Sequence, residues 1–163
     1  MKTRCHCVCL FVCFLLIIFI SAPLPLRAED KTRLSNGQSI YVPAYSHIYI
    51  GDRERSFQLT VTLSIRNIDP KHTIKVTKAD YYETQGNLLK NFLDKPVNLN
   101  PLESIRYVIP EKEKVGGSGA NFMVQWESDK SVNPPIVESV MIGASSGQGI
   151  SFSSRGQVVF ATD

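Results

Sequence analysis

The sequence predicts an all-β protein, an immunoglobulin-like antiparallel β-sandwich, and three observations favour this fold class. Residues 57–66 alternate apolar and polar side chains without a break, which is typical of a strand with one buried and one solvated face. Other short runs of strand character recur at intervals of about ten residues, with turn-forming residues between them. No apolar period of 3.6 residues persists long enough to support a helix.

The first 28 residues differ from the rest of the chain and predict a secretory signal peptide. A basic start at residues 1–4 precedes an unbroken apolar run over 8–20, and prolines and small residues follow over 21–28. The run is shorter than the ~20 residues of a membrane-spanning helix, so a permanent anchor is the less favoured interpretation. With cleavage after Ala28, we expect a periplasmic or secreted protein. Only a leader that stays uncleaved would hold the protein at the membrane.

The positions of the cysteines and the net charge of residues 29–163 exclude several classes of function. All four cysteines lie in this leader, so residues 29–163 have no disulfide, no catalytic thiolate and no cysteine-ligated metal. Removal of the leader also leaves fifteen basic against fifteen acidic residues. A neutral chain without a basic cluster lacks the electrostatic footprint of a nucleic-acid-binding protein, and no nucleic-acid partner is expected.

The remaining chain divides into a flexible tether over residues 29–39 and a single sandwich domain over residues 40–163. Pro43 separates two strand-like runs, and because proline cannot donate to a ladder it predicts an edge strand or a strand that switches sheets. The longest alternation, 57–66, is interpreted as an interior strand. Further strands are expected at 73–82 with a bulge near Thr77 or Lys78, and at 88–93, 96–99, 102–109, 121–127, 137–142, 150–152 and 157–160.

Two glycine-rich stretches resemble catalytic or anion-binding motifs. Residues 143–147 match the G-x-S-x-G pattern of serine hydrolases, but that motif requires a strand-to-helix turn, and another strand follows here. Residues 116–119 could bind an anion through backbone amides, yet they lack the lysine and the following helix of a phosphate loop. Flexible or hairpin loops are the favoured interpretation of both.

His47 and His72 are the histidines left after the leader, and they could ligate a metal together with Met123 or a carboxylate. They are not closely spaced, so surface or packing roles are favoured, and no cofactor is expected. The carboxylates are scattered and form no pair of the kind that acid–base catalysis requires. We therefore expect no enzymatic activity. The alternative is a metal- or ligand-binding periplasmic enzyme subunit that uses both histidines.

Aromatic residues suggest a core position and a possible partner surface. Trp126 alternates inward with Phe122, which predicts a tryptophan between two sheets. Tyr41, Tyr45 and Tyr49 recur at every fourth position, so one continuous strand would place them on a common face. Such a strip could contact a partner. Packing at a sheet rim is the alternative, because Pro43 interrupts the run.

Three segments carry a resemblance to a known family: residues 41–70, 116–126 (GGSGANFMVQW) and 149–156 (GISFSSRG). Over about residues 41–159 the chain resembles a family of exported bacterial proteins, the domain of unknown function numbered 3124. The resemblance implies a bacterial source and an envelope location, and it brings no catalytic residues. The distinctive residues that it marks are Tyr45, Ser46, Gly51, Asp52, Arg66, Asn67, Asp69, Pro70, Asn121, Trp126, Gly149, Ser153, Arg155 and Gly156.

The expected functional surface combines the loop 116–121 with the segment 145–156, the two stretches richest in glycine and small polar residues. Its candidate residues are Asn121, Ser153 and Arg155. The guanidinium of Arg155 would supply a fixed positive charge for an anionic or carboxylate ligand. We expect an exported, non-enzymatic binding or accessory module of the envelope, whose partner is an unknown envelope protein or a small ligand.

Overall fold

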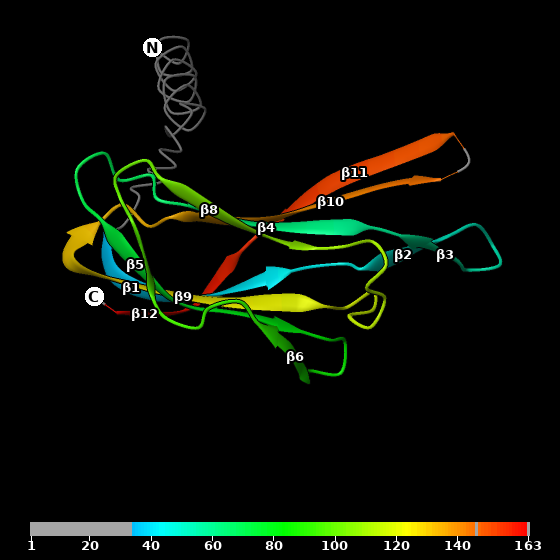
Figure 1. The fold of residues 1–163 in the computed structure, drawn as a ribbon, viewed down its shortest axis with the longest axis horizontal. Coiled ribbons are helices and arrows are strands. Elements are labelled where there is room, and N and C mark those ends of the chain that lie inside the picture. Colours follow the sequence, from blue (N-terminus) through cyan, green and yellow to red (C-terminus); the bar gives the residue numbers. More distant parts are fainter. Residues whose placement is uncertain (1–33, 146, 163) are drawn as a thin grey trace, which may run out of the picture. The chain divides into compact units, whose positions relative to one another are not determined.

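The computed structural model describes residues 34–145 and 147–162, which form strands, turns and loops without a helix (Figure 1). The strands are β1 (Ser35–Pro43), β2 (His47–Ile50), β3 (Arg55–Gln58), β4 (Thr60–Arg66), β5 (Ile74–Tyr82), β6 (Leu88–Asn91), β7 (Val97–Leu99), β8 (Ser104–Ile109), β9 (Asn121–Val132), β10 (Ile136–Ser145), β11 (Gln148–Arg155) and β12 (Gln157–Thr162). Their pairings are antiparallel. The prediction of an all-β, antiparallel fold is confirmed.

The predicted signal peptide and the first residues of the predicted tether lie outside the described residues. Within the described part of the chain, no helix has the length and apolar character that crossing a bilayer requires.

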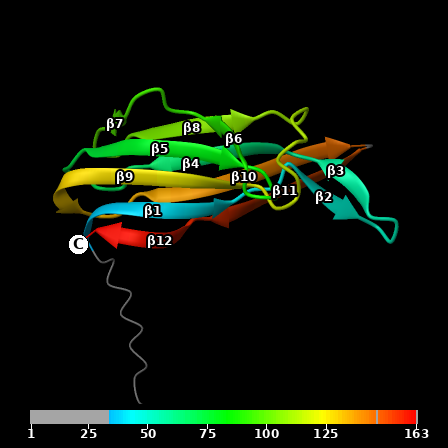
Figure 2. The same ribbon diagram turned by 90° about the horizontal axis from the view of Figure 1, so that it is seen from below.

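The strands form two larger sheets and one small one. The six-stranded sheet has the order β12-β1-β9-β5-β6, with β7 also paired to β5, and the four-stranded sheet has the order β11-β10-β4-β8. Strands β2 and β3 form a separate hairpin. The larger sheets appear as two layers in Figures 1 and 2, and alternate residues of both contribute to one buried apolar cluster. That burial supplies the main stabilisation of the fold.

The alternating stretch 57–66 comprises two strands rather than one. Strand β3 ends at Gln58 and pairs with β2, whereas β4 begins at Thr60 and lies between β10 and β8. The backbone N–H of Leu59 donates instead to the carbonyl of Ser46, at 2.9 Å. Alternation continues across this change of partner because Leu59 is fully buried. The prediction of one continuous strand is therefore wrong, but its interior position in the sheet is correct for β4.

Strand β1 differs from the sequence-based expectation at both of its ends. Residues 35–39, expected in the tether, pair with β9 and partly with β12. The strand is therefore interior, and the edge-strand alternative is wrong. The other predicted alternative, a change of sheet, agrees with the structure, because β1 belongs to the six-stranded sheet whereas β2, after Pro43, pairs with β3. Pro43 is accommodated because it is the last residue of the strand, opposite Asn121. The two buried residues Ile40 and Val42 point into the core.

The bulge predicted near Thr77 or Lys78 is confirmed by a register shift between Val76 and Lys78, against β9. Trp126 and Phe122 are buried as predicted. Two predicted loops are mostly strand: β9 continues to Val132, and β10 and β11 fill most of 143–149. Polar composition misled these predictions. In the second stretch, glycine and serine are tolerated because β10 and β11 pair up to Ser145 and Gln148.

Gly156 marks the point where the chain leaves the four-stranded sheet at β11 and enters the six-stranded sheet as β12. Its N–H donates to the carbonyl of Val137 at 2.8 Å. A Cβ atom at this position would lie 2.5 Å from Cγ2 of Ile40 and 3.0 Å from the Val137 oxygen. The transfer between sheets therefore depends on the absence of a side chain.

Candidate functional site

The outer face of the four-stranded sheet collects arginines and hydroxyl groups, and we call it the arginine–hydroxyl face. Its inward neighbours, such as Leu63 and Met141, are fully buried, so the alternate residues point outward. The face is formed by Thr60, Thr62, Ser64, Arg66, Ser104, Arg106, Val108, Glu138, Val140, Ile142, Ser151, Ser153 and Arg155.

Strand register places four of these residues in one row across the sheet. Arg155 is opposite Glu138, Glu138 is opposite Ser64, and Ser64 is opposite Arg106. The next row, in the direction of the β10–β11 turn, contains Ser153, Val140, Thr62 and Val108. Residues far apart in the sequence thus form one continuous surface.

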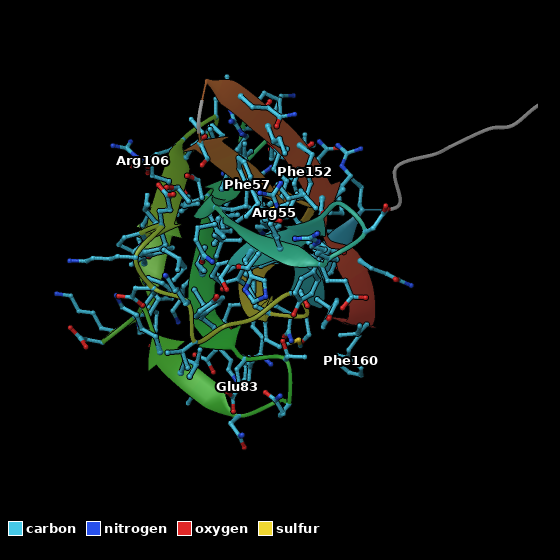
Figure 3. The ribbon with its side chains drawn as sticks, turned by 90° about the vertical axis from the view of Figure 1, so that its right-hand side faces the viewer. Arg55, Phe57, Glu83, Arg106, Phe152 and Phe160 are labelled. Carbon is cyan, nitrogen blue, oxygen red and sulfur yellow. The ribbon has the colours of Figure 1, made fainter. Side chains whose placement is uncertain are left out.

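Charge is unbalanced along the first row. Arg66 lies beside it, where its Nε donates to Oγ of Ser64 at 3.1 Å and lies 3.6 Å from Oε1 of Glu138. Neither Arg106 nor Arg155 forms an ion pair with a described residue. Three guanidinium groups therefore accompany one carboxylate. In Figure 3, the Arg106 side chain projects outward from β8.

The chemistry that this surface offers is recognition of anions. A guanidinium presents a rigid fork of N–H donors that matches a carboxylate, and the neighbouring hydroxyls both donate and accept. The exposed side chains of Val108 and Ile142 add apolar contact area. The face contains no histidine, cysteine or lysine, and its single carboxylate is in an ion pair.

Two of the three predicted surface residues, Ser153 and Arg155, belong to this face, but Asn121 does not. Asn121 lies in β9, opposite Pro43 and Tyr82 in the six-stranded sheet. Its neighbour Phe122 points into the core, so Asn121 points to the outer side of the other layer. The prediction that these residues share one surface is wrong, because the chain places them on opposite faces of the sandwich.

The structure adds Arg106 and Glu138 to the site, which the sequence-based reasoning missed. A signal for Arg106 was present, since the inward alternation of Ile105, Tyr107 and Ile109 implies that Arg106 points outward. Its nearness to Arg155 depended on the order of strands across the sheet, which no local pattern reveals.

The glycine-rich loop over 116–119 is fixed by hydrogen bonds. The Gly117 carbonyl accepts from both the N–H of Ser46, at 3.0 Å, and its Oγ, at 3.1 Å. Oγ1 of Thr84 donates to the Gly116 carbonyl and accepts from the Gly119 N–H, each at 3.0 Å. The loop therefore uses these groups internally, and its role is structural.

Close packing explains the glycine at the start of this loop. A Cβ atom on Gly116 would lie 1.9 Å from the hydroxyl oxygen of Tyr81, whose side chain is buried. The loop therefore packs closely against the buried Tyr81, as the favoured interpretation of a plain loop requires.

The G-x-S-x-G match begins inside β10, and β11 follows it directly. The strand-to-helix turn that a nucleophilic serine needs is therefore not formed there. Gly143 has a packing role instead, because a Cβ atom there would lie 2.5 Å from the carbonyl oxygen of Gln58. Phe57, labelled in Figure 3 together with Phe152, packs against the same position.

The two histidines lie at opposite ends of β4. His47 is opposite Gln58, before this strand, and His72 contacts Asp69, after it. The seven residues of β4 alone span about 23 Å. The alternative prediction of one site that uses both imidazoles is therefore wrong. Among the described residues, no group of three or more His, Cys, Asp or Glu side chains is arranged to hold a metal ion.

The three tyrosines of the predicted aromatic strip belong to different elements. Tyr41 lies in β1, and Tyr49 in β2 packs edge-on against His47 with ring centroids 5.2 Å apart. Tyr45 lies between these strands, and its ring packs edge-on against Phe152 of β11 with ring centroids 5.7 Å apart. The single strand that would place them on a common face does not form, because β1 ends at Pro43 and β2 begins at His47 in a separate two-stranded sheet.

One charged cluster on the six-stranded sheet joins Asp80 to Lys78 and Tyr82 through Oδ2 of the carboxylate, whereas its Oδ1 is buried without a hydrogen-bond partner among the described residues. Asp80 is only 3% exposed, and its Oδ2 lies 3.0 Å from Nζ of Lys78 and 3.2 Å from the hydroxyl of Tyr82. The hydrogen bond to Asp80 raises the pKa of Lys78. These contacts account for the cluster as a structural ion pair next to Asn121.

Comparison with known proteins identifies a family but no activity. The model of a family described as "Protein of unknown function (DUF3124)" matches residues 37–159. The crystal structure of Thermotoga maritima 1070 is similar at 12% sequence identity, with a TM-score of 0.45, and the match covers 74% of this chain and 92% of that one. A likeness at this level carries no argument here. No curated protein matches the chain.

Proposed function

This chain belongs to the DUF3124 family, and we propose that it is an exported, non-enzymatic binding module of the bacterial envelope whose arginine–hydroxyl face binds an acidic protein partner. We further propose that its two facing sheets form an immunoglobulin-like sandwich. The observation that carries the binding proposal is the row Arg155–Glu138–Ser64–Arg106, with Arg66 beside it. The predicted leader supports export, and the facing sheets with Trp126 buried in the core support the fold type.

The spacing of the arginines favours a partner with several negative charges. Arg155 and Arg106 lie three strand spacings apart, or about 14 Å at about 4.8 Å per strand. One small carboxylate cannot contact both groups, whereas an acidic segment of a protein presents charges over this distance. The same face exposes Val108 and Ile142 at 43% and 55%. Arginine together with exposed apolar side chains is typical of protein interfaces.

The rigidity of the surface supports the same proposal. All four strands of the sheet are paired in register over a buried core, so the guanidinium stems rise from a fixed platform. A rigid platform reduces the ordering cost of binding. The opposing carboxylate of Glu138 would orient neighbouring guanidinium groups while leaving a net positive surface.

A titration with poly-glutamate as an acidic probe tests the proposal. In buffer of low ionic strength, we expect the protein to bind the probe, and we expect R106A/R155A to weaken binding about tenfold through loss of charge pairs. The matched control is R53A/R55A, which removes two arginines from the β2–β3 hairpin instead. Failure of the wild-type protein to bind, or equal weakening by the two double variants, would contradict the proposed face.

Export is tested separately by N-terminal sequencing of the product that a bacterial cell releases from its cytoplasm. A new N-terminus at residue 29 is the expected result. A product that is retained in the cytoplasm with an intact leader would contradict the envelope location.

A further inference from the structure

Strand β12 forms one edge of the six-stranded sheet. It pairs with β1 on one side, and no described strand pairs with its other side. Backbone N–H and C=O groups on the free side of an edge strand are available to pair with another strand. This edge is separate from the arginine–hydroxyl face, which belongs to the other sheet.

The composition of β12 sets it apart from the other strands that end the two larger sheets. Strands β6, β8 and β11 contain Lys90, Arg106 and Arg155, and charges of this kind oppose edge-to-edge pairing. Strand β12, with the sequence QVVFAT, contains neither a charged residue nor a proline. It therefore lacks the side chains that usually protect such an edge.

The side chains of β12 are also unusually exposed for their type. Val158, Val159 and Phe160 are 45%, 58% and 65% exposed. The register shift between Ser39 and Ile40 leaves Val159 without an opposite residue in β1. In Figure 3, Phe160 projects away from the sandwich. Exposure of three consecutive apolar side chains to water on an unpaired edge is unfavourable, and a partner that covers them would remove this exposure.

We propose that β12 pairs antiparallel with β12 of a second copy of this chain and joins two sandwiches through a continuous sheet. A second copy fits because two-fold pairing brings two uncharged strands together without repulsion. Two-fold pairing also brings the exposed apolar residues 158–160 of one copy next to the same residues of the other copy. The contact uses the same surface on both copies, so no free copy of that surface is left and assembly stops at the dimer. An acidic or basic strand would find no complementary charge on β12 itself.

The area available sets the expected strength of this dimer. The exposed parts of Val158, Val159 and Phe160 amount to roughly 600 Å² over two copies, below the ~1,200 Å² of standard stable interfaces. Backbone hydrogen bonds add to this contact. We therefore expect a dimer whose fraction rises with protein concentration, rather than a permanent one.

Sedimentation velocity on the purified product of the full chain tests the proposal, over roughly a hundredfold range of concentration. The wild-type protein should shift from monomer toward dimer as concentration rises, and V159K should remain monomeric over the whole range. The matched control is L88K, which places the same charge on an exposed leucine of β6, at the opposite edge of the sheet. L88K should dimerise like the wild-type protein.

A cross-linking measurement provides an independent readout. F160C should form a covalent dimer under mild oxidation, because two-fold pairing brings both copies of β12 together, whereas L88C should not. A wild-type monomer at every concentration, dimerisation of V159K equal to wild type, or loss of dimer in L88K would each overturn the proposal. F160S, which keeps the strand neutral, replaces V159K if thermal unfolding shows that the lysine disturbs the fold.

Discussion

Asp69 and Asn133 are joined by two hydrogen bonds although 64 positions separate them in the chain. The backbone N–H and the side-chain amide of Asn133 donate to Oδ2 of Asp69, at 3.0 and 3.1 Å. Oδ1 of the same carboxylate accepts from the N–H groups of Lys71 and His72, each at 2.9 Å. The turn after β4 is thus fastened to the turn between β9 and β10.

Asp69 should make stability depend on pH in the acid range. Hydrogen bonds from Asn133 and then from Lys71 hold the pKa of its carboxyl well below its ordinary value of 3.8. The unfolded chain then binds this proton at higher pH than the folded chain does. The stabilisation is therefore complete above pH 3.8 and is lost as the pH falls through the lowered folded pKa. D69N should flatten this acid limb in urea unfolding measured at several pH values.

The matched control for this measurement is D52N, because Asp52 is exposed in the turn between β2 and β3. It should leave the acid limb as it is in the wild-type protein. An acid limb of D69N as steep as that of the wild-type protein would contradict the role assigned to Asp69.

Tyr81 should produce a loss of stability in the alkaline range. Burial, followed by the charge of Glu113, raises the pKa of Tyr81 to about 12 from an ordinary value of 10.0. The unfolded chain therefore loses this proton first, and the contribution to stability declines as pH rises from 10 to 12. Burial also raises the pKa of Tyr107, so absorbance titration of the phenolates should show fewer tyrosines ionising near pH 10 in the wild-type protein than in its urea-unfolded form, and Y81F should reduce this difference.

Y81F provides the corresponding stability test. The Tyr81 hydroxyl is buried without a hydrogen-bond partner among the described residues, so its removal should leave stability at neutral pH unchanged or higher. Y81F should also reduce the alkaline loss. A large destabilisation at neutral pH would show that the hydroxyl has a partner.

G156A should destabilise the protein by about 1–3 kcal/mol, the usual cost of forcing an extra methyl into a packed site. The added Cβ would approach Ile40 and the Val137 carbonyl at the transfer between the two sheets. The matched control is G149A, since a Cβ atom at Gly149 meets no atom within 4 Å. Thermal unfolding should separate the two variants. Equal midpoints would contradict the packing argument.

L63A and T62A test the two faces of β4 directly. Leu63 is fully buried, and its truncation should lower the free energy of unfolding by about 2–5 kcal/mol. Thr62 points to the outer face, and its truncation should change stability by no more than about 0.5 kcal/mol. Urea unfolding of both variants measures the difference. Similar losses in the two would mean that the sheet is covered on both faces.

Short-range patterns predicted most of the strands. The alternation of residues 57–66 identified the buried face of β4, and the phase change in the next strand identified its bulge. The same patterns failed where backbone hydrogen bonds to distant residues, rather than local composition, determine the structure. Residues 35–39 appear polar and flexible, yet pairing on both sides makes them part of an interior strand. Leu59 continues the alternation, although its backbone pairs with Ser46 outside the sheet.

The candidate site was predicted only in part for the same reason. Ser153 and Arg155 were recognised from their segment, whereas Arg106 and Glu138 join them through strand order and register. Asn121 was grouped with them because its loop has similar composition, and the structure places it on the other layer.

Three properties could be predicted without coordinates: the all-β fold class, the buried and solvated faces of β4, and the resemblance to the family to which the chain belongs. Those properties depend on side-chain periodicity and short motifs, which act within a few residues. Two further properties required the folded arrangement of the strands: the single row that contains Arg155, Glu138, Ser64 and Arg106, and the separation of the two histidines. Such relationships depend on hydrogen bonds between distant strands, and many registers share the same local pattern until a common core selects one.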